Sequence, residues 1–265
     1  MAERGAALVT GGARRIGRAL VVCAAEAGYD VAIHVRGVDD EAEAAAAEVR
    51  ARGRKAAILS CDLRKESTTV ALVGEAEAEL GAVTLLVNSA SVFEEDAFAD
   101  MNRASWDAHV ETNLRAPLVL AQVFARRLPE GREGLIVNLL DQRVLNLGPG
   151  FFSYSLSKAA LWDATRMLAQ ALAPRIRVNG IGPGPTLPSI HQDQAAFDAE
   201  CEATLLGRPV APAEIALALR YLIDARSVTG QMIAVDAGQH LAGQHWAGQH
   251  WAGQHSAGQH WAGKP

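Results

Sequence analysis

Short apolar runs alternate with longer amphipathic stretches along nearly the whole chain, and this alternation is the feature that most constrains the fold. Runs typical of buried strands cover Ala6–Val9, Val31–Val35, Ala56–Ser60, Leu85–Asn88, Leu135–Leu140, Ile176–Gly180 and Met232–Val235. Helical patterns cover Arg15–Ala27, Glu41–Arg52, Thr68–Leu80, Ser105–Leu128, Tyr154–Leu172 and Pro212–Ile223. Strands that alternate with helices form parallel βαβ units with right-handed crossovers. The sequence therefore predicts an α/β fold, a single doubly wound domain of about seven parallel strands with helices on both faces.

The end of the chain follows a different pattern. A five-residue unit, Ala-Gly-Gln-His followed by Leu, Trp or Ser, begins at Ala237 and runs five times through Trp261. Five residues keep neither a helix face nor a strand face in register, and each unit contains a helix-penalising Gly. We therefore expect one domain over residues 1–241 and an extended or disordered low-complexity tail over 242–265. Metal binding by its histidines or partner contacts by its tryptophans are alternative uses, involving His240, His245, His250, His255, His260, Trp246, Trp251 and Trp261.

Composition excludes several classes of protein. The 265-residue chain has a formal net charge of -5, which disfavours nucleic acid and anionic membranes as partners. Its three cysteines show no CxxC spacing, so neither a disulfide framework nor a zinc site is indicated. No segment approaches the roughly 18 apolar residues of a membrane span. We expect a cytoplasmic protein without a metal centre.

A glycine-rich turn follows the first predicted strand, with the sequence Thr10-Gly11-Gly12-Ala13-Arg14-Arg15-Ile16-Gly17. Glycines let the backbone approach a ligand closely, and the free N–H groups of the following helix attract a pyrophosphate. A strand before the turn and a helix after it are the context of the Rossmann-type dinucleotide site. We expect cofactor contacts at Gly11, Arg14, Arg15, Ile16 and Gly17.

The end of the second predicted strand indicates which dinucleotide binds. A site for NAD usually has a carboxylate there to bind the ribose hydroxyls. Here the residues are His34-Val35-Arg36, and guanidinium groups suit a 2′-phosphate. We therefore predict NADPH, with contacts from Arg36 and, less directly, His34. After the third strand, Asp62 with its neighbour Leu63 either meets the adenine edge or caps a helix or turn.

Tyr154 and Lys158 open a long helical pattern four residues apart, so both side chains lie on one helix face. A free phenol is too weak an acid–base group at neutral pH. A neighbouring cation favours the phenolate and lowers the phenol pKa. The pair is thus expected to supply a general acid for a hydride acceptor.

These motifs occur in the order typical of one family. The turn motif is followed by Asn88-Ser89-Ala90-Ser91 after the fourth strand, by Asn113 in the next helix, and by Tyr154 and Lys158. Over residues 5 to 241 the chain resembles the short-chain dehydrogenases/reductases. The resemblance implies a proton relay through Asn113, Tyr154 and Lys158, and cofactor contacts from Asn88, Ala90, Tyr154, Lys158, Pro183 and Gly184. It also implies a homotetramer.

One position departs from that family. Thirteen residues before the tyrosine the family usually has Ser, whereas this chain has Asp141. A carboxylate repels a developing alkoxide, but it suits a ring C=N whose nitrogen must gain a proton, provided that burial raises its pKa. Asp at this position resembles the pteridine reductase branch. In that branch an arginine at the place of Arg15 reaches the pterin, and a Ser-x-Phe at the place of Ser91 and Phe93 stacks a ring on the pterin.

We therefore expect an NADPH-dependent reductase of a pterin or folate-like ring C=N bond, with a small-molecule substrate held by Arg15, Ser91, Phe93, Asp141 and Tyr154. A carbonyl reductase that acts on a ketone such as a 3-oxoacyl group is the alternative enzyme. A non-catalytic module that senses NADPH is the alternative from another class, and intact Tyr154 and Lys158 speak against it. Residues 186–206 match no pattern that identifies the substrate.

Overall fold

The seven apolar runs form seven strands of one parallel sheet, which confirms the predicted fold class. The computed structural model describes residues 4–189 and 192–242. The strand order is β3-β2-β1-β4-β5-β6-β7, and every neighbouring pair is parallel. The strands are β1 (Ala6–Thr10), β2 (Asp30–Val35), β3 (Ala56–Ser60), β4 (Val83–Asn88), β5 (Gly134–Leu139), β6 (Ile176–Pro183) and β7 (Met232–Val235).

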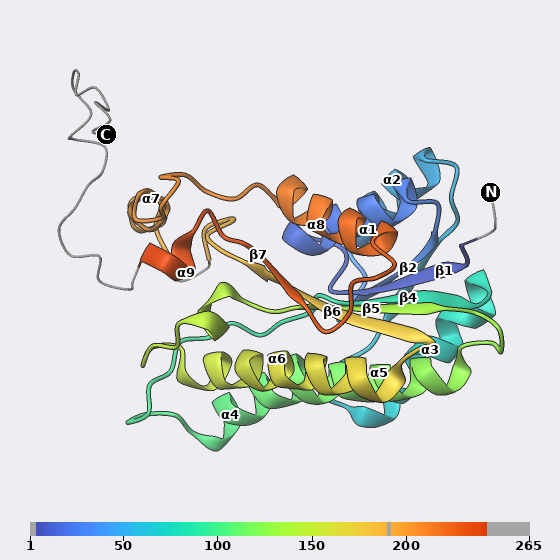
Figure 1. Ribbon diagram of the computed structural model, residues 1–265, viewed down its shortest axis with the longest axis horizontal. Coiled ribbons are helices and arrows are strands. Elements are labelled where there is room, and N and C mark those ends of the chain that lie inside the picture. The colour runs from blue at the N-terminus through green and yellow to red at the C-terminus, as the bar shows by residue number, and fades with distance from the viewer. Residues whose placement is uncertain (1–3, 190–191, 243–265) are drawn as a thin grey trace, which may run out of the picture.

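Helices cover both faces of this sheet (Figure 1). One face carries α1 (Arg15–Glu26), α2 (Asp40–Ala51) and α8 (Pro212–Asp224), and the other carries α3 (Glu66–Leu80), α5 (Ala116–Arg127) and α6 (Phe152–Leu172). Successive side chains of a strand point to opposite faces. In β1, Ala7 and Val9 accordingly pack into the first core, whereas Ala6 and Leu8 pack into the second. Central strands buried on both sides explain why their sequences are apolar without alternation.

Several helical segments differ from the prediction. The expected helix over Ser105–Leu128 is α4 (Arg103–Val110), a π-helical turn η1 (Glu111–Arg115) and then α5. Apolar periodicity cannot reveal one widened turn inside an otherwise continuous helix. Short helices that the sequence did not predict are η2 (Gln142–Leu145), α7 (Gln194–Glu202) and α9 (Gln239–Ala242). Each is shorter than the window over which helical periodicity is informative.

The strand order reverses between β1 and β4, so the crevice at their carboxyl ends is the expected ligand site of this topology. The turn before α1 and the segments after β4, β5 and β6 all lie at that edge. In Figure 1, α7 and α9 lie side by side beyond the carboxyl ends of β6 and β7. Within residues 4–189 and 192–242, no helix has the length and apolar character needed to cross a bilayer.

Candidate active site

The glycine-rich turn between β1 and α1 packs too closely for side chains at two positions. A Cβ on Gly17 would collide with the carbonyl oxygen of Gly11, and Gly11 itself has a φ of 64° and faces the backbone of Ala90. The first turn of α1 has no side-chain cap, so its N–H groups are open to an anion. The turn therefore has the shape and polarity of a phosphate cradle.

The three arginines predicted near the cofactor phosphates lie in different surroundings. Arg14 pairs with Asp39 and Glu41 at the start of α2. Arg15, with a φ of 51°, donates hydrogen bonds of 2.9 Å to two carbonyl oxygens, those of Leu187 and Pro188. Arg36 is exposed at the end of β2 and forms no ion pair with any residue that the structure describes. Arg36 is thus the guanidinium that can meet a phosphate without first leaving a partner.

The contacts that His34 makes are within the protein, and its predicted contact with the cofactor stays a prediction. Its side chain is 3% exposed and does not line the cavity of the site. Nδ1 lies 3.4 Å from the Gly11 nitrogen and Nε2 lies 3.1 Å from the Cys61 carbonyl oxygen. Burial lowers the pKa of the imidazole, which keeps it neutral so that one nitrogen accepts and the other donates. His34 therefore links the glycine-rich turn to the residue that follows β3, from the buried side of the turn.

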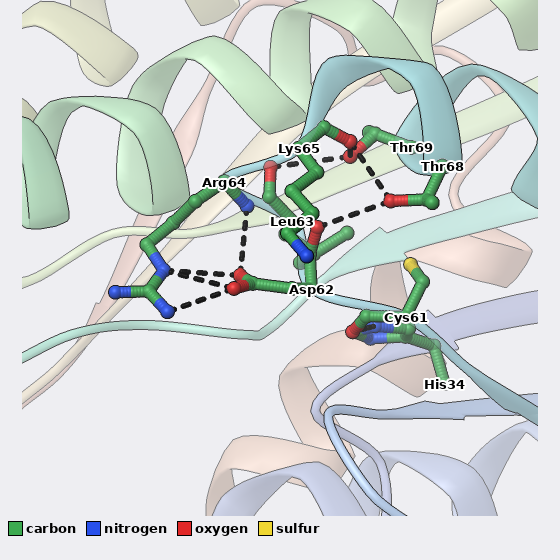
Figure 2. Close-up of polar contacts among 8 residues, drawn as sticks. All are labelled: His34, Cys61, Asp62, Leu63, Arg64, Lys65, Thr68 and Thr69. Carbon is green, nitrogen blue, oxygen red and sulfur yellow. Dashed lines mark hydrogen bonds and ion pairs between the residues drawn. The ribbon is translucent and has the colours of Figure 1, made fainter.

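Asp62 stabilises the turn that follows β3 (Figure 2). Its carboxylate accepts hydrogen bonds of 2.7 to 3.2 Å from the Arg64 guanidinium and one of 3.0 Å from the Arg64 backbone N–H. These bonds hold the pKa of Asp62 at about 2. Leu63 is buried, and its carbonyl accepts a hydrogen bond from Thr69. Asp62 thus caps the turn, which is one of its two predicted roles. The other role, contact with an adenine, stays a prediction.

The last residue of β4, Asn88, carries a buried acceptor without a partner among the residues that the structure describes. The Asn88 side chain donates a 2.8 Å hydrogen bond from Nδ2 to Asn138 Oδ1, while its own Oδ1 is buried and has no partner in the described part of the protein. The N–H groups of Ser89 and Ala90 donate to Thr10 Oγ1 at 3.0 and 3.1 Å. A buried acceptor of this kind is normally satisfied by a ligand or a water.

Tyr154, Asp141 and Lys158 meet at the start of α6 and the end of β5. The Tyr154 hydroxyl donates a 2.7 Å hydrogen bond to Asp141 Oδ2, and Asp141 Oδ1 accepts one of 2.8 Å from the Arg143 N–H. Lys158 Nζ donates to the Leu139 carbonyl oxygen at 2.7 Å and lies 5.8 Å from the centre of the Tyr154 ring. The carboxyl group and the phenol, thirteen residues apart in sequence, are therefore joined by a direct hydrogen bond.

The electrostatics of this cluster depart from one prediction. Burial raises the pKa of Asp141, as the sequence predicts for a proton-donating carboxyl. The pKa of Tyr154 was expected to be lowered by Lys158, but burial and the Asp141 charge raise it well above its ordinary value. Burial also lowers the pKa of Lys158 to about 8. Tyr154 is thus held as a neutral phenol, which is the form that donates a proton.

Asn113 clamps a loop, and its side chain does not contact Tyr154 or Lys158 as a relay through the side chain would require. It lies in the π-helical turn and is fully buried. Its Oδ1 accepts from Ser91 Oγ at 3.2 Å and from Val92 N–H at 2.8 Å, and its Nδ2 donates to Val92 O at 2.9 Å and Ser157 Oγ at 3.1 Å. Three of these bonds fix the loop that leads to Phe93, and the fourth joins Asn113 to α6.

Phe93 belongs to an aromatic cluster that the sequence did not predict in full. Its ring is stacked on that of Phe151 at 4.4 Å and meets the Tyr154 ring edge-on at 4.7 Å. The Arg143 guanidinium lies 4.8 Å from the centre of the Phe151 ring. Phe151 and Arg143 carried no signal of their own, because their place beside Phe93 follows from the fold alone. The cluster places aromatic ring surface beside the phenol, where a further aromatic ring can pack.

One cavity of about 440 Å³ joins the turn, the catalytic cluster and this wall. Pro183 and Gly184 line it at the end of β6, and a Cβ on Gly184 would lie 2.6 Å from the Asp236 Cα. The lining residues that the sequence did not predict include Gln192, Phe197, Glu200 and Gln239. Gln239 lies in the first copy of the five-residue unit, which forms α9 and is anchored by His240 on Asp236. The rest of the predicted tail, from residue 243, lies outside the described residues.

Comparisons with known proteins agree with this geometry. The family model described as short chain dehydrogenase matches residues 5–198. The chain is 30% identical over 240 residues to 3-oxoacyl-[acyl-carrier-protein] reductase FabG of Staphylococcus epidermidis, which covers 89% of this chain and 98% of the relative. It is 47% identical, with a TM-score of 0.85, to the structure of FolM alternative dihydrofolate reductase 1 from Brucella canis complexed with NADP, which covers 91% of this chain and 96% of that one. The Brucella suis protein, also in complex with NADP, is 48% identical with a TM-score of 0.87 and coverages of 91% and 97%.

The sheet topology, the glycine-rich turn and the tyrosine–lysine pair on α6 occur together over the length that the family model and the relatives match. On this evidence the chain belongs to the short-chain dehydrogenase family and is an oxidoreductase.

Proposed function

We propose that this protein is an NADPH-dependent reductase of a ring C=N bond in a pterin or folate-like substrate. The observation that carries the proposal is the hydrogen bond between Asp141 and Tyr154, in which a carboxyl group of raised pKa stands at the reacting end of the cavity. A carboxyl whose pKa is raised by burial can take part in proton delivery to a ring nitrogen through the Tyr154 hydroxyl to which it is hydrogen-bonded. The similarity to proteins named alternative dihydrofolate reductase supports the same substrate class.

The residues present fit NADPH. The open start of α1 with Gly11, Ile16 and Gly17 would hold the pyrophosphate, and Arg36 with Arg14 would hold the 2′-phosphate. The buried Oδ1 of Asn88 could accept a hydrogen bond from the cofactor. Ala90, Pro183 and Gly184 line the cavity that the cofactor would occupy. The NADP complexes of the Brucella proteins support this assignment.

When bound, NADPH supplies the hydride. Tyr154 holds a proton on its hydroxyl and would pass it towards the acceptor, and Asp141 Oδ2, which accepts a hydrogen bond from that hydroxyl, would return a proton to it. Lys158 is fixed to the Leu139 carbonyl, with Nζ close enough to Asp141 to oppose the rise of the Asp141 pKa. Phe93 orients a flat substrate ring by stacking, with Arg15 and Ser91 at the same cavity.

A substrate panel tests the proposal. NADPH oxidation with a dihydropterin and with dihydrofolate is expected to exceed oxidation with a 3-oxoacyl thioester. Asp141→Ser should lower kcat for the dihydropterin by about 100-fold, because the carboxyl proton is lost. Asp107→Ser, at a half-buried position on α4 that does not line the cavity, serves as control. If the protein instead prefers the thioester, and Asp141→Ser raises kcat for the thioester, the protein is a carbonyl reductase, the alternative that the similarity to FabG supports. Turnover of any substrate excludes a purely sensing module.

Arg36 gives a separate prediction about the cofactor. Arg36→Leu is expected to lower kcat/KM for NADPH by about tenfold and to leave kcat/KM for NADH nearly unchanged, because only NADPH has the 2′-phosphate. The measurement is the ratio of the two values, with exposed Arg50→Leu on α2 as control. An equal loss with both cofactors would contradict the assigned contact. The cytoplasmic location, the homotetramer and the absence of nucleic acid as a partner stay predictions.

A further inference from the structure

A carboxylate lines the outer end of the cavity, where α7 and α9 lie side by side. Glu200 in α7 accepts a 2.9 Å hydrogen bond on Oε1 from Gln239 Nε2 and a 2.7 Å hydrogen bond on Oε2 from Gln192 Nε2. All three side chains line the cavity. Gln192 in turn accepts from the Ser189 N–H at 3.3 Å. The three side chains therefore tie together the loop after β6, the helix that follows it and the first copy of the repeated unit.

Glu200 has no cationic partner among the residues that the structure describes. Both of its hydrogen-bond donors are neutral amides, and it takes part in none of the ion pairs of this region. Each carboxylate oxygen has two lone pairs, so one acceptor position on each oxygen is left beside the amide. A half-buried carboxylate of this kind attracts N–H and O–H donors and repels anions.

Four cationic side chains also line the cavity, those of Arg14, Arg15, Arg143 and Lys158, and none of them pairs with Glu200. Arg143 and Lys158 both oppose the rise of the Asp141 pKa, so their charges act at the reacting end. Arg143 also lies over the Phe151 ring, and Arg15 is bound to the carbonyls of Leu187 and Pro188. Glu200 does not contribute to the pKa shifts of Asp141 or Tyr154. Glu200 is thus a carboxylate of the cavity wall that stands apart from the charged groups acting on Asp141 and Tyr154.

The outer end is still close enough to meet a bound substrate. Helix α9, which carries Gln239, contacts η2, the 3-10 turn that directly follows Asp141. Glu200, hydrogen-bonded to Gln239 of α9, is therefore placed where a substituent that extends from the reacting end towards α9 can meet it.

We propose that Glu200 is a specificity-determining residue, which favours reducible rings with neutral, hydrogen-bond-donating substituents and disfavours rings whose substituents carry carboxylates. The proposal rests on the proposed function and names the substrate class within it: pterins with hydroxylated side chains rather than folates with their glutamate carboxylates. The two amides fix the carboxylate in place, so that its charge faces the cavity rather than solvent.

Glu200→Gln tests the proposal, because it removes the charge and keeps the shape. The ratio of kcat/KM for dihydrobiopterin to kcat/KM for dihydrofolate is expected to fall by about tenfold in the variant, since the anionic tail is no longer repelled. Raising the salt concentration should lower this ratio in the wild-type protein and leave it nearly constant in the variant. Glu202→Gln, an exposed change of the same charge on the same helix, should keep the wild-type ratio.

Equilibrium binding separates this proposal from the proposed function. Titration of biopterin and folic acid into the protein with NADP needs no turnover, and the same shift in their affinity ratio is expected for Glu200→Gln. If neither dihydro compound is reduced but the affinity ratio shifts, the proposed function fails and Glu200 keeps its role. An unchanged ratio in a variant with wild-type thermal stability overturns the role of Glu200, as does an equal shift in Glu202→Gln. Glu200→Ala replaces the glutamine variant if that variant does not fold.

Discussion

Replacing Tyr154 by Phe is expected to lower kcat by about 1000-fold, because the hydroxyl that donates the proton is lost while the ring that packs on Phe93 remains. The pKa of Tyr154 is raised by burial and by Asp141, so the group is a proton donor over the whole neutral range. The KM for NADPH should change little. Single-turnover measurement of NADPH oxidation isolates the chemical step.

Tyr221→Phe is the matched control for this change, since that tyrosine is exposed on α8, away from the cavity. Its kcat should equal that of the wild-type protein. A Tyr154→Phe variant with more than about a tenth of wild-type kcat would show that another group donates the proton, and Asp141 would be the first to examine.

Lys158 is expected to make the protein more stable as the pH rises from about 8 to 10, opposite to the effect of a lysine that gains a carboxylate partner. Burial lowers the pKa of Lys158 from 10.5 to about 8. Between these values the unfolded chain binds more protons than the folded one, so the free energy of unfolding increases with pH. Above pH about 10 the raised pKa of Tyr154 acts in the opposite direction, because folding then holds a proton that the unfolded chain releases.

The measurement is the free energy of unfolding of the wild-type protein minus that of Lys158→Met, obtained from denaturant titrations without cofactor. This difference should increase by about 2 kcal/mol between pH about 7 and about 10. The corresponding difference for exposed Lys65→Met should show no such increase. A difference for Lys158→Met that is constant or falls with pH would mean that the buried ammonium has a stabilising partner.

The fold could be predicted closely from the sequence, because the spacing of apolar residues differs between buried strands and amphipathic helices. Strands such as β1 and β4 are buried on both faces and must be apolar throughout, and the helices between them carry one apolar stripe. The π-helical turn at Asn113 leaves no such trace, since widening one turn changes no residue type. The segment from Thr186 to Leu206 is also short of periodic signal, although α7 forms there.

The candidate site was predictable where chemistry depends on local spacing. Tyr154 and Lys158 share a helix face by their spacing alone, and Asp141 differs from the Ser that the family usually has thirteen residues before the tyrosine. The hydrogen bonds of His34 with Gly11 and Cys61 were not predictable. A histidine at the end of a strand has the same sequence pattern whether its ring faces a cofactor or packs under a turn. Phe151 and Glu200 reach the cavity through tertiary packing, which no spacing rule encodes.

The hydrogen bonds from Ser89 and Ala90 to Thr10 join residues 79 and 80 positions apart in the sequence. During synthesis β1 emerges long before β4, so the crevice between them has no second wall until most of the first half of the chain has been made. Contacts of such long range slow folding and make it cooperative. A growing or truncated chain that ends before β4 therefore has the phosphate turn but no binding cleft, and nucleotide affinity would arise late, together with the closed sheet.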